Sequence, residues 1–249
     1  RELTDIFAVQ DEVTQEIVAA LALNLTEGEQ QHLAIEHTDN PESYDCFLRG
    51  REQWWRQTRE SNVQAREMLQ RAVDLDANFA PAFTFLGVAH MHDYVNEWSA
   101  APSRSLELAH ECRERAVALD DTHPYAHWAL GSIYLWMRRH DEAIRATEIA
   151  ISLDPNFALG NITLGFILHY AGRSGEALVC LDRGMAFDPY YPDIYLHFQA
   201  QAYFQLGQFE TAVGILKRRL LRNPGTDISR VLRASCYGHL GRLDGARAE

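Results

Sequence analysis

The stretch PYAHWALGSIYLWMRRHDEAIRATEIAISLDPNF, residues 124–157, decides the fold of this 249-residue chain. It holds the pair Leu130-Gly131 in one apolar run, Ala143 and Ala150 in a second run, and Asp154-Pro155 near its end. The residue before a proline is pushed out of the α region, so the Asp-Pro pair predicts the end of one helix and the start of another. The stretch therefore predicts a helix, a tight turn and a second helix.

The same features recur along the chain at spacings of 34 or 35 residues, with one spacing of 44. The alanines that begin apolar runs are Ala65, Ala109, Ala143, Ala177, Ala212 and Ala246. Small residues recur where two helix backbones approach closely. Gly172, Gly207 and Gly241 fall where a helix C-terminus needs a left-handed residue. Each unit is therefore a helix pair whose apolar face must be buried against its neighbours.

This pattern resembles the tetratricopeptide repeat, or TPR, a unit of 34 residues with Leu-Gly, Ala and Pro at fixed places. The resemblance implies an all-α solenoid, in which antiparallel helix pairs stack into a right-handed superhelix. The repeat array is expected at residues 38–249, in units at about 43–79, 80–123, 124–157, 158–192, 193–226 and an incomplete 227–249. The ten extra residues of the second unit predict a longer first helix or a loop around Trp98.

Residues 1–37 are expected to form an amphipathic helix and a linker. Apolar residues recur there at helical spacing, namely Ile6, Val9, Val13, Ile17 and Leu21. Because apolar residues lie on more than one face of this helix, and because the sixth unit is incomplete, we expect both ends of the array to be adhesive. The chain should then fray from about residue 227 onward or associate with itself through an end.

A narrower resemblance covers residues 3–21, 44–61 and 72–83. These segments are similar to a bacterial subfamily in which they link an N-terminal regulatory or catalytic module to a C-terminal repeat array. Its members include class III adenylate/guanylate cyclases and winged-helix transcriptional regulators. The resemblance implies that this chain, which begins at Arg1 rather than at a methionine, is the C-terminal interaction part of a larger regulatory protein. No cyclase motif or winged helix can be placed in it.

Composition argues against several classes of function. The formal net charge of −12 disfavours nucleic acid as a partner. No stretch approaches the roughly 18 to 20 apolar residues of a membrane span, so a soluble chain is expected. The four cysteines are widely spaced and form no C-x-x-C motif, which favours a reducing, cytoplasmic location. They are Cys46, Cys112, Cys180 and Cys236.

No pattern of residues predicts chemistry. The sequence lacks G-x-S-x-G and S-x-x-K motifs and phosphate-binding glycine loops. His123 and His127 could share a helix face, but no third metal ligand has a natural spacing. The basic run Lys217-Arg218-Arg219 is interpreted as the solvated end of a helix, where cations are favourable. We therefore expect no catalytic residue, no cofactor and no metal.

The resemblance implies that the first helix of each unit faces a concave groove through repeat positions 2, 5, 9, 12 and 13. The predicted peptide-binding groove consists of Tyr125, Trp128, Ser132, Trp136, Ile162, Phe166, His169, Tyr170, His197, Gln201 and Phe204. At least a third of these side chains are expected to pack between helices instead. Family members that bind acidic C-termini use Lys, Asn and Arg at groove positions. The matching places here hold Thr84, Val88, Trp128, Ala129 and Ser132, so an acidic tail is not expected.

An apolar, aromatic surface of this kind usually marks a site for a partner. The chain is therefore predicted to be a non-catalytic scaffold that binds a protein or peptide through this groove. Two alternatives remain open. The chain could be a module that forms homodimers and so regulates a fused enzyme such as an adenylate cyclase, or a small-molecule sensor that uses the same groove as a pocket.

Overall fold

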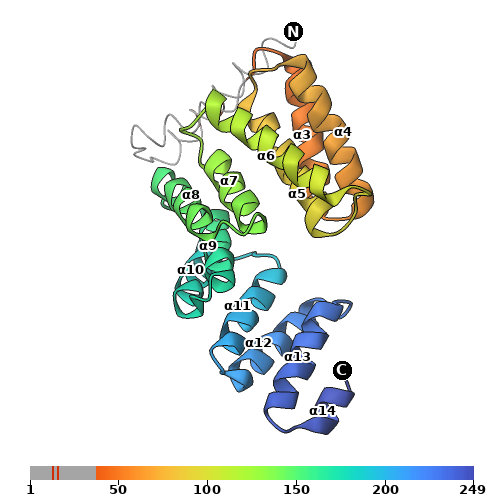
Figure 1. Cartoon of the computed structure of the whole chain (residues 1–249), viewed down its shortest axis with the longest axis vertical. Helices are drawn as coiled ribbons and strands as arrows, with labels where there is room; N and C mark the ends of the chain where they lie inside the picture. Colours follow the sequence, from red (N-terminus) through yellow and green to blue (C-terminus); the bar gives the residue numbers. More distant parts are fainter. Residues whose placement is uncertain (1–12, 14–15, 17–37) are drawn as a thin grey trace. The chain divides into compact units, whose positions relative to one another are not determined.

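The computed structural model describes residues 13, 16 and 38–249, and within these residues it contains helices and no strands (Figure 1). The predicted N-terminal helix lies outside the described residues, apart from Val13 and Glu16. From residue 38 onward the helices begin with α3 (Pro41–Trp55), α4 (Arg59–Leu75), α5 (Ala80–Val95) and α6 (Pro102–Leu119). They are followed by α7 (Pro124–Trp136), α8 (His140–Leu153), α9 (Ala158–Tyr170), α10 (Ser174–Phe187), α11 (Ile194–Gln205), α12 (Phe209–Arg222), α13 (Asp227–His239) and α14 (Leu243–Arg247).

The helices form two compact units, the first ending at Asp121 and the second beginning at Thr122. The sequence did not predict this division. Within each unit, every helix packs on the next one along the chain, and the first helices of successive pairs also contact one another. This is the packing of stacked helix pairs, which confirms the predicted all-α, TPR-type solenoid.

The aligned small residues lie where the two helices of a pair approach each other, as predicted. A Cβ atom added to Gly131 would lie 3.0 Å from the carbonyl oxygen of Ala143, and one added to Gly165 would lie 2.9 Å from that of Ala177. The glycines of the Leu-Gly pairs and the aligned alanines thus lie opposite each other in one close contact between the two helices, and this contact recurs along the chain.

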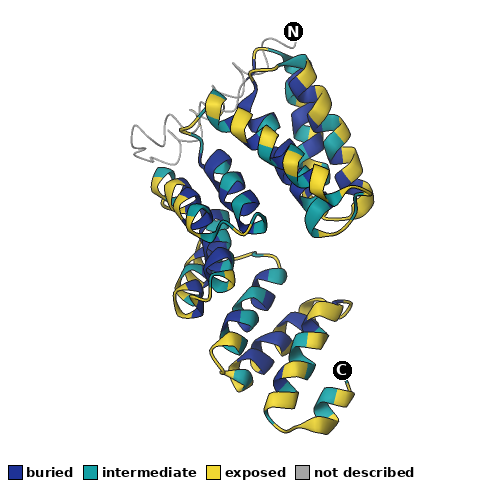
Figure 2. Cartoon of the chain, in the orientation of Figure 1, coloured by how far each residue is buried: buried dark blue, intermediate teal, exposed yellow. Residues whose placement is uncertain are grey.

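Burial differs between the two helices of the pairs α5–α6, α7–α8 and α9–α10 (Figure 2). Nine of the 13 residues of α7 are buried, but only five of the 14 residues of α8. In these pairs the first helix is covered by helices on several sides, whereas the second helix turns one face to solvent. The surface that α5, α7 and α9 leave uncovered is therefore largely apolar.

The ten extra residues of the second pair are shared among three places. The helix α5 is three residues longer than α7, α6 is four residues longer than α8, and residues 96–101 make a connection three residues longer than 137–139. Both predicted outcomes therefore occur together, and the longer second helix was not predicted. Buried Asp93 secures the extension, because its carboxylate accepts from Asn62 Nδ2 at 2.8 Å and pairs with Arg66 Nε at 2.9 Å.

The turns between the two helices of a pair use a left-handed residue, as predicted. Gly172, Gly207 and Gly241 have φ values of +78°, +74° and +70°. In the pair formed by α7 and α8 the same place is taken by Arg138, whose φ is +60°. A side chain in this conformation costs roughly 1 kcal/mol.

At this turn position, replacing a glycine by alanine and replacing the arginine by glycine should therefore change the free energy of unfolding in opposite directions. We expect Gly172→Ala to lower the free energy of unfolding by about 1 kcal/mol, since no atom crowds the site and only the backbone conformation is penalised. Arg138→Gly should raise it by about 0.5 kcal/mol. Urea unfolding measures both changes, and a neutral Gly172→Ala would contradict the assignment of the turn.

At the end of the array, Val231 of α13 and Leu243 of α14 are exposed, while Leu232, Tyr237 and Leu240 are partly buried. An ion pair of 2.6 Å between Arg233 and Glu249 joins α13 to the last residue of the chain. The expected fraying or self-association through the ends stays a prediction.

Candidate protein-binding face

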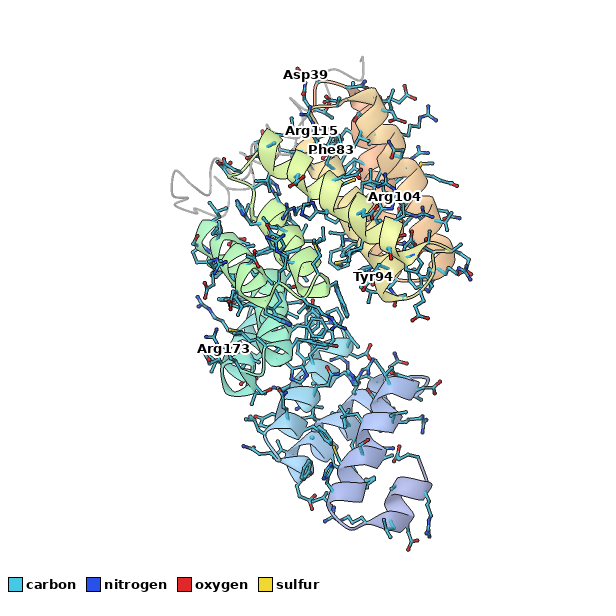
Figure 3. All side chains as sticks on the ribbon, in the orientation of Figure 1. Asp39, Phe83, Tyr94, Arg104, Arg115 and Arg173 are labelled. Carbon is cyan, nitrogen blue, oxygen red and sulfur yellow. The ribbon has the colours of Figure 1, made fainter. Side chains whose placement is uncertain are left out.

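Three first helices of the second unit contain no charged residue. The helices α7, α9 and α11 together have no Asp, Glu, Lys or Arg, although such residues make up 23% of the chain. Charged side chains lie instead on or beside the second helices, as Arg173 immediately before α10 illustrates (Figure 3). A partner that contacts α7, α9 and α11 therefore meets no charge on these helices that could pair with its own.

Four aromatic rings form a continuous row across these three helices. The rings of Trp136 and Phe166 have their centroids 6.4 Å apart, and those of Phe166 and Tyr170 are 4.9 Å apart. Phe166 also lies 4.4 Å from the ring of Phe198 on α11. We call Trp136, Phe166, Tyr170 and Phe198 the aromatic face. Three of the four rings are partly buried, and Tyr170 is 46% exposed.

The eleven predicted groove residues fall into two groups. Trp128, Ser132, Ile162 and His197 are buried, whereas Tyr125, Trp136, Phe166, His169, Tyr170, Gln201 and Phe204 retain some exposure. Trp128 is only 4% exposed, and its Nε1 donates to Thr163 Oγ1 at 2.7 Å across the contact between α7 and α9. This ring packs between helices, so a charge placed there would be expected to unfold the unit.

Sequence reasoning missed Phe198. It occupies repeat position 6, where the two preceding units carry Ala129 and Thr163, so neither neighbour marks the position as aromatic. The structure shows that position 6 faces the first helix of the preceding pair. There Thr163 meets Trp128, and Phe198 meets Phe166.

The first unit has its own aromatic cluster on α3 and α5. The ring of Trp54 lies 4.6 Å from that of Trp55, 5.5 Å from that of Phe85 and 5.4 Å from that of His92. Trp54 is buried, whereas Trp55 is about half exposed. None of these residues belongs to the predicted groove.

Burial sets the electrostatics of the second unit. It lowers the pKa of His169 and raises the pKa of its neighbour Tyr170. Burial, together with the charge of Arg219, lowers the pKa of His197 to about 4. Tyr195 has its pKa raised to about 12, mainly by burial. All four groups are therefore neutral at pH 7, so they add no charge to the first helices.

Other motifs of the sequence find structural roles. Arg219 is buried and pairs with Asp193 at 3.0 Å, so the interpretation of the whole basic run as solvated is wrong at this residue, while Lys217 and Arg218 are exposed. All four cysteines are free thiols. Within the part of the chain that is described, no group of His, Cys, Asp and Glu could hold a metal ion, and no helix is long and apolar enough to span a membrane.

Comparison with protein families agrees with this architecture. A family model described as "Tetratricopeptide repeat" matches residues 124–157, the stretch that decided the fold. A second model, described as "Anaphase-promoting complex, cyclosome, subunit 3", matches residues 171–249. Residues 124–157 thus form a tetratricopeptide repeat, and the chain has the fold of TPR proteins.

Solved structures with the same fold share little sequence with the chain. A thermophilic TPR protein of Thermus thermophilus has a TM-score of 0.63 at 16% identity, covering 78% of this chain and 98% of its own. PilW, a type IV pilus biogenesis factor, has a TM-score of 0.67 at 18% identity, covering 84% of this chain and 90% of its own. These similarities concern the fold alone.

A curated relative supports the narrower resemblance. The chain is 40% identical over 146 residues to a protein of Rhizobium meliloti (strain 1021) described as "Putative adenylate cyclase 3". The match covers 59% of this chain and 25% of that protein. The chain thus spans about a quarter of its relative.

Proposed function

We propose that this chain is a non-catalytic scaffold whose aromatic face binds an uncharged, apolar segment of a partner protein. The observation that carries the proposal is the continuous row of four partly exposed rings on three helices without a charged residue. Rigid aromatic side chains give large contact areas at a low cost in conformational entropy, and they dominate the energetics of many interfaces.

The absence of charge on these helices also restricts the partner. A charged group brought against such a surface would lose its hydration without gaining an ion pair, which is unfavourable. An acidic C-terminal tail is therefore a poor ligand, in keeping with the lack of Lys, Asn and Arg at the matching groove positions.

Two exposed tyrosines provide a matched test. Peptides would be selected on the full chain from a displayed random library, and their affinities measured for two variants. We expect Tyr170→Asp to weaken binding by about 30-fold, because it places a charge in the aromatic face. Tyr190→Asp should leave binding unchanged, since Tyr190 is 94% exposed on the connection between α10 and α11.

Both variants should remain folded, because Tyr190 is almost fully exposed and Tyr170 is about half exposed, and thermal unfolding of each variant checks this. Equal binding by the two variants would contradict the proposal. So would a selection dominated by acidic peptides, because it would place the ligand on another surface.

The similarity to the protein described as an adenylate cyclase favours a role for this chain within a larger regulatory protein. On this reading the chain is the interaction part of a larger regulatory protein, and any cyclase activity belongs to another part of that protein. The second candidate is a module that dimerises and thereby regulates a fused enzyme. Light scattering over a range of concentrations separates the two, because a dimerising module predicts a mass that levels off at twice that of the monomer in the absence of peptide, whereas association through adhesive ends has no such limit.

A further inference from the structure

The neighbours of His197, on α11, determine which of its two ring nitrogens carries the hydrogen. Its Nδ1 lies 2.9 Å from Ser229 Oγ on α13, and Arg219 donates to the same oxygen through Nη1. Arginine has only donors, so this hydroxyl accepts from Arg219. Ser229 is fully buried, and among the described residues the one acceptor within reach of its hydroxyl hydrogen is His197 Nδ1, to which it therefore donates. The neutral ring of His197 therefore carries its own hydrogen on Nε2.

His169, on α9, has the opposite arrangement. Its Nδ1 lies 3.2 Å from Ser174 Oγ, and the Ser174 hydroxyl donates to Oε1 of Gln205. Because that hydroxyl has already used its hydrogen, it accepts from His169 Nδ1. The neutral ring of His169 therefore has its hydrogen on Nδ1 and a free lone pair on Nε2.

The two Nε2 atoms have no hydrogen-bond partner among the described residues, and neither is fully buried, although His197 as a whole is only 5% exposed. The helices that carry the two rings, α9 and α11, contact each other. The rings also border the aromatic face, since His169 lies 5.5 Å from the ring of Tyr170 and His197 lies 6.5 Å from that of Phe198. The uncharged helices thus present one N–H donor and one nitrogen acceptor beside the aromatic rings.

We propose that His197 and His169 together recognise the main chain of the bound segment. The proposal rests on the proposed function and names the conformation of the partner. A backbone carbonyl of the segment accepts from His197 Nε2, and a backbone N–H donates to His169 Nε2. A peptide backbone supplies one acceptor and one donor per residue. In a helical segment, however, these backbone groups already hydrogen-bond one another. The partner segment is therefore extended.

The same chemistry argues against other ligands. A carboxylate has no hydrogen to give to His169 Nε2, and an ammonium has no lone pair for His197. The nearby cation, Arg219, is occupied by Asp193 and Ser229 behind the ring of His197. A main-chain amide group satisfies both histidines without bringing a charge onto α9 or α11.

The proton arrangement can be tested without any ligand. Long-range ¹H–¹⁵N spectra of the full chain at neutral pH distinguish the two tautomers of a histidine ring. We expect the Nε2–H form for His197 and the Nδ1–H form for His169. The variants Ser229→Ala and Ser174→Ala assign the signals and should disturb one ring each. Finding the same tautomer in both rings would overturn the proposal.

The binding step is tested with a peptide that loses affinity in the Tyr170→Asp variant. Each of its amide N–H groups is replaced in turn by N-methyl, and each amide in turn by an ester, whose carbonyl is a weaker acceptor. We expect one N-methyl position and one ester position to weaken binding at least tenfold. The effect of that N-methyl group should vanish in the His169→Phe variant, which has no acceptor.

The outcomes separate the two proposals. If no peptide binds in a manner that depends on Tyr170, the proposed function itself fails. If peptides bind but tolerate N-methylation at every position, or bind as helices, recognition of the main chain by the histidine pair is overturned and the proposed function stands.

Discussion

When the pH is lowered from 7 to 5, the first unit is expected to lose about 4 kcal/mol of its free energy of unfolding, more than the second unit loses. Burial lowers the pKa of His92 to about 4 in the first unit, and burial together with Arg66 and Arg104 does the same for His90. Unfolding would return both groups to their ordinary value of 6.5, so the unfolded chain binds protons more strongly. Stability is therefore fully present above pH 6.5 and is lost progressively as the pH falls toward 4.

The magnitude follows from the shift of each group. A histidine whose pKa is about 4 in the folded protein and 6.5 in the unfolded chain contributes a loss of about 2 kcal/mol at pH 5. The first unit has two such groups, whereas the second has His197 and a smaller contribution from His169. Since a domain is typically stable by only about 5 to 15 kcal/mol, the first unit should unfold first on acidification.

Urea unfolding at graded pH, with hydrogen exchange to resolve the two units, measures this difference. The His92→Gln variant should remove about half of the pH-dependent loss in the first unit and leave the second unit unchanged. If the second unit lost as much stability as the first, or if the first were insensitive to pH, the buried neutral state of these histidines would be wrong.

Gly165→Ala is expected to destabilise the second unit by about 2 kcal/mol, although alanine is the better helix former. The added Cβ would lie 2.9 Å from the carbonyl oxygen of Ala177 and 2.7 Å from Leu181 Cγ. The first of these is a backbone atom, so α9 and α10 must move apart to admit the methyl group. The loss of packing along the pair then exceeds the gain in helix propensity.

Gly214→Ala is the matched control. Gly214 lies inside α12 in the same unit, and no atom lies within 4 Å of its added Cβ. We expect this substitution to stabilise the unit by about 0.5 to 1 kcal/mol. Thermal or urea unfolding of both variants measures the two changes in the free energy of unfolding. Similar effects of the two substitutions would show that the Leu-Gly position is not a close helix contact.

The parts of the fold that depend on local spacing could be predicted from the sequence. The series that contain Gly165 and Ala177 mark a steric requirement that only small residues meet, and the requirement recurs in each helix pair. Gly172 and its equivalents likewise mark turns through a conformation that glycine adopts easily. Such features are visible in sequence because a single residue type satisfies them.

The candidate site was less predictable, because the repeat positions specify a helix face only to within about a residue. Trp128 and Phe166 were both placed in the groove, but the structure buries the first against Thr163 and leaves the second in the aromatic row. Phe198 was missed because its position carries small residues in the neighbouring units. The proton arrangement of His197 depends on Ser229 and Arg219, which are distant in sequence, so no local pattern predicts it.

Among residues 38–249, the main helix contacts join helices one or two places apart along the chain, and this has a kinetic consequence. Folding such a chain closes only short loops, and proteins with so local a contact pattern fold within microseconds to milliseconds. During synthesis, a helix pair can gain its native contacts as soon as the following pair has left the ribosome. The order in which the pairs fold is therefore expected to be the order in which they are translated.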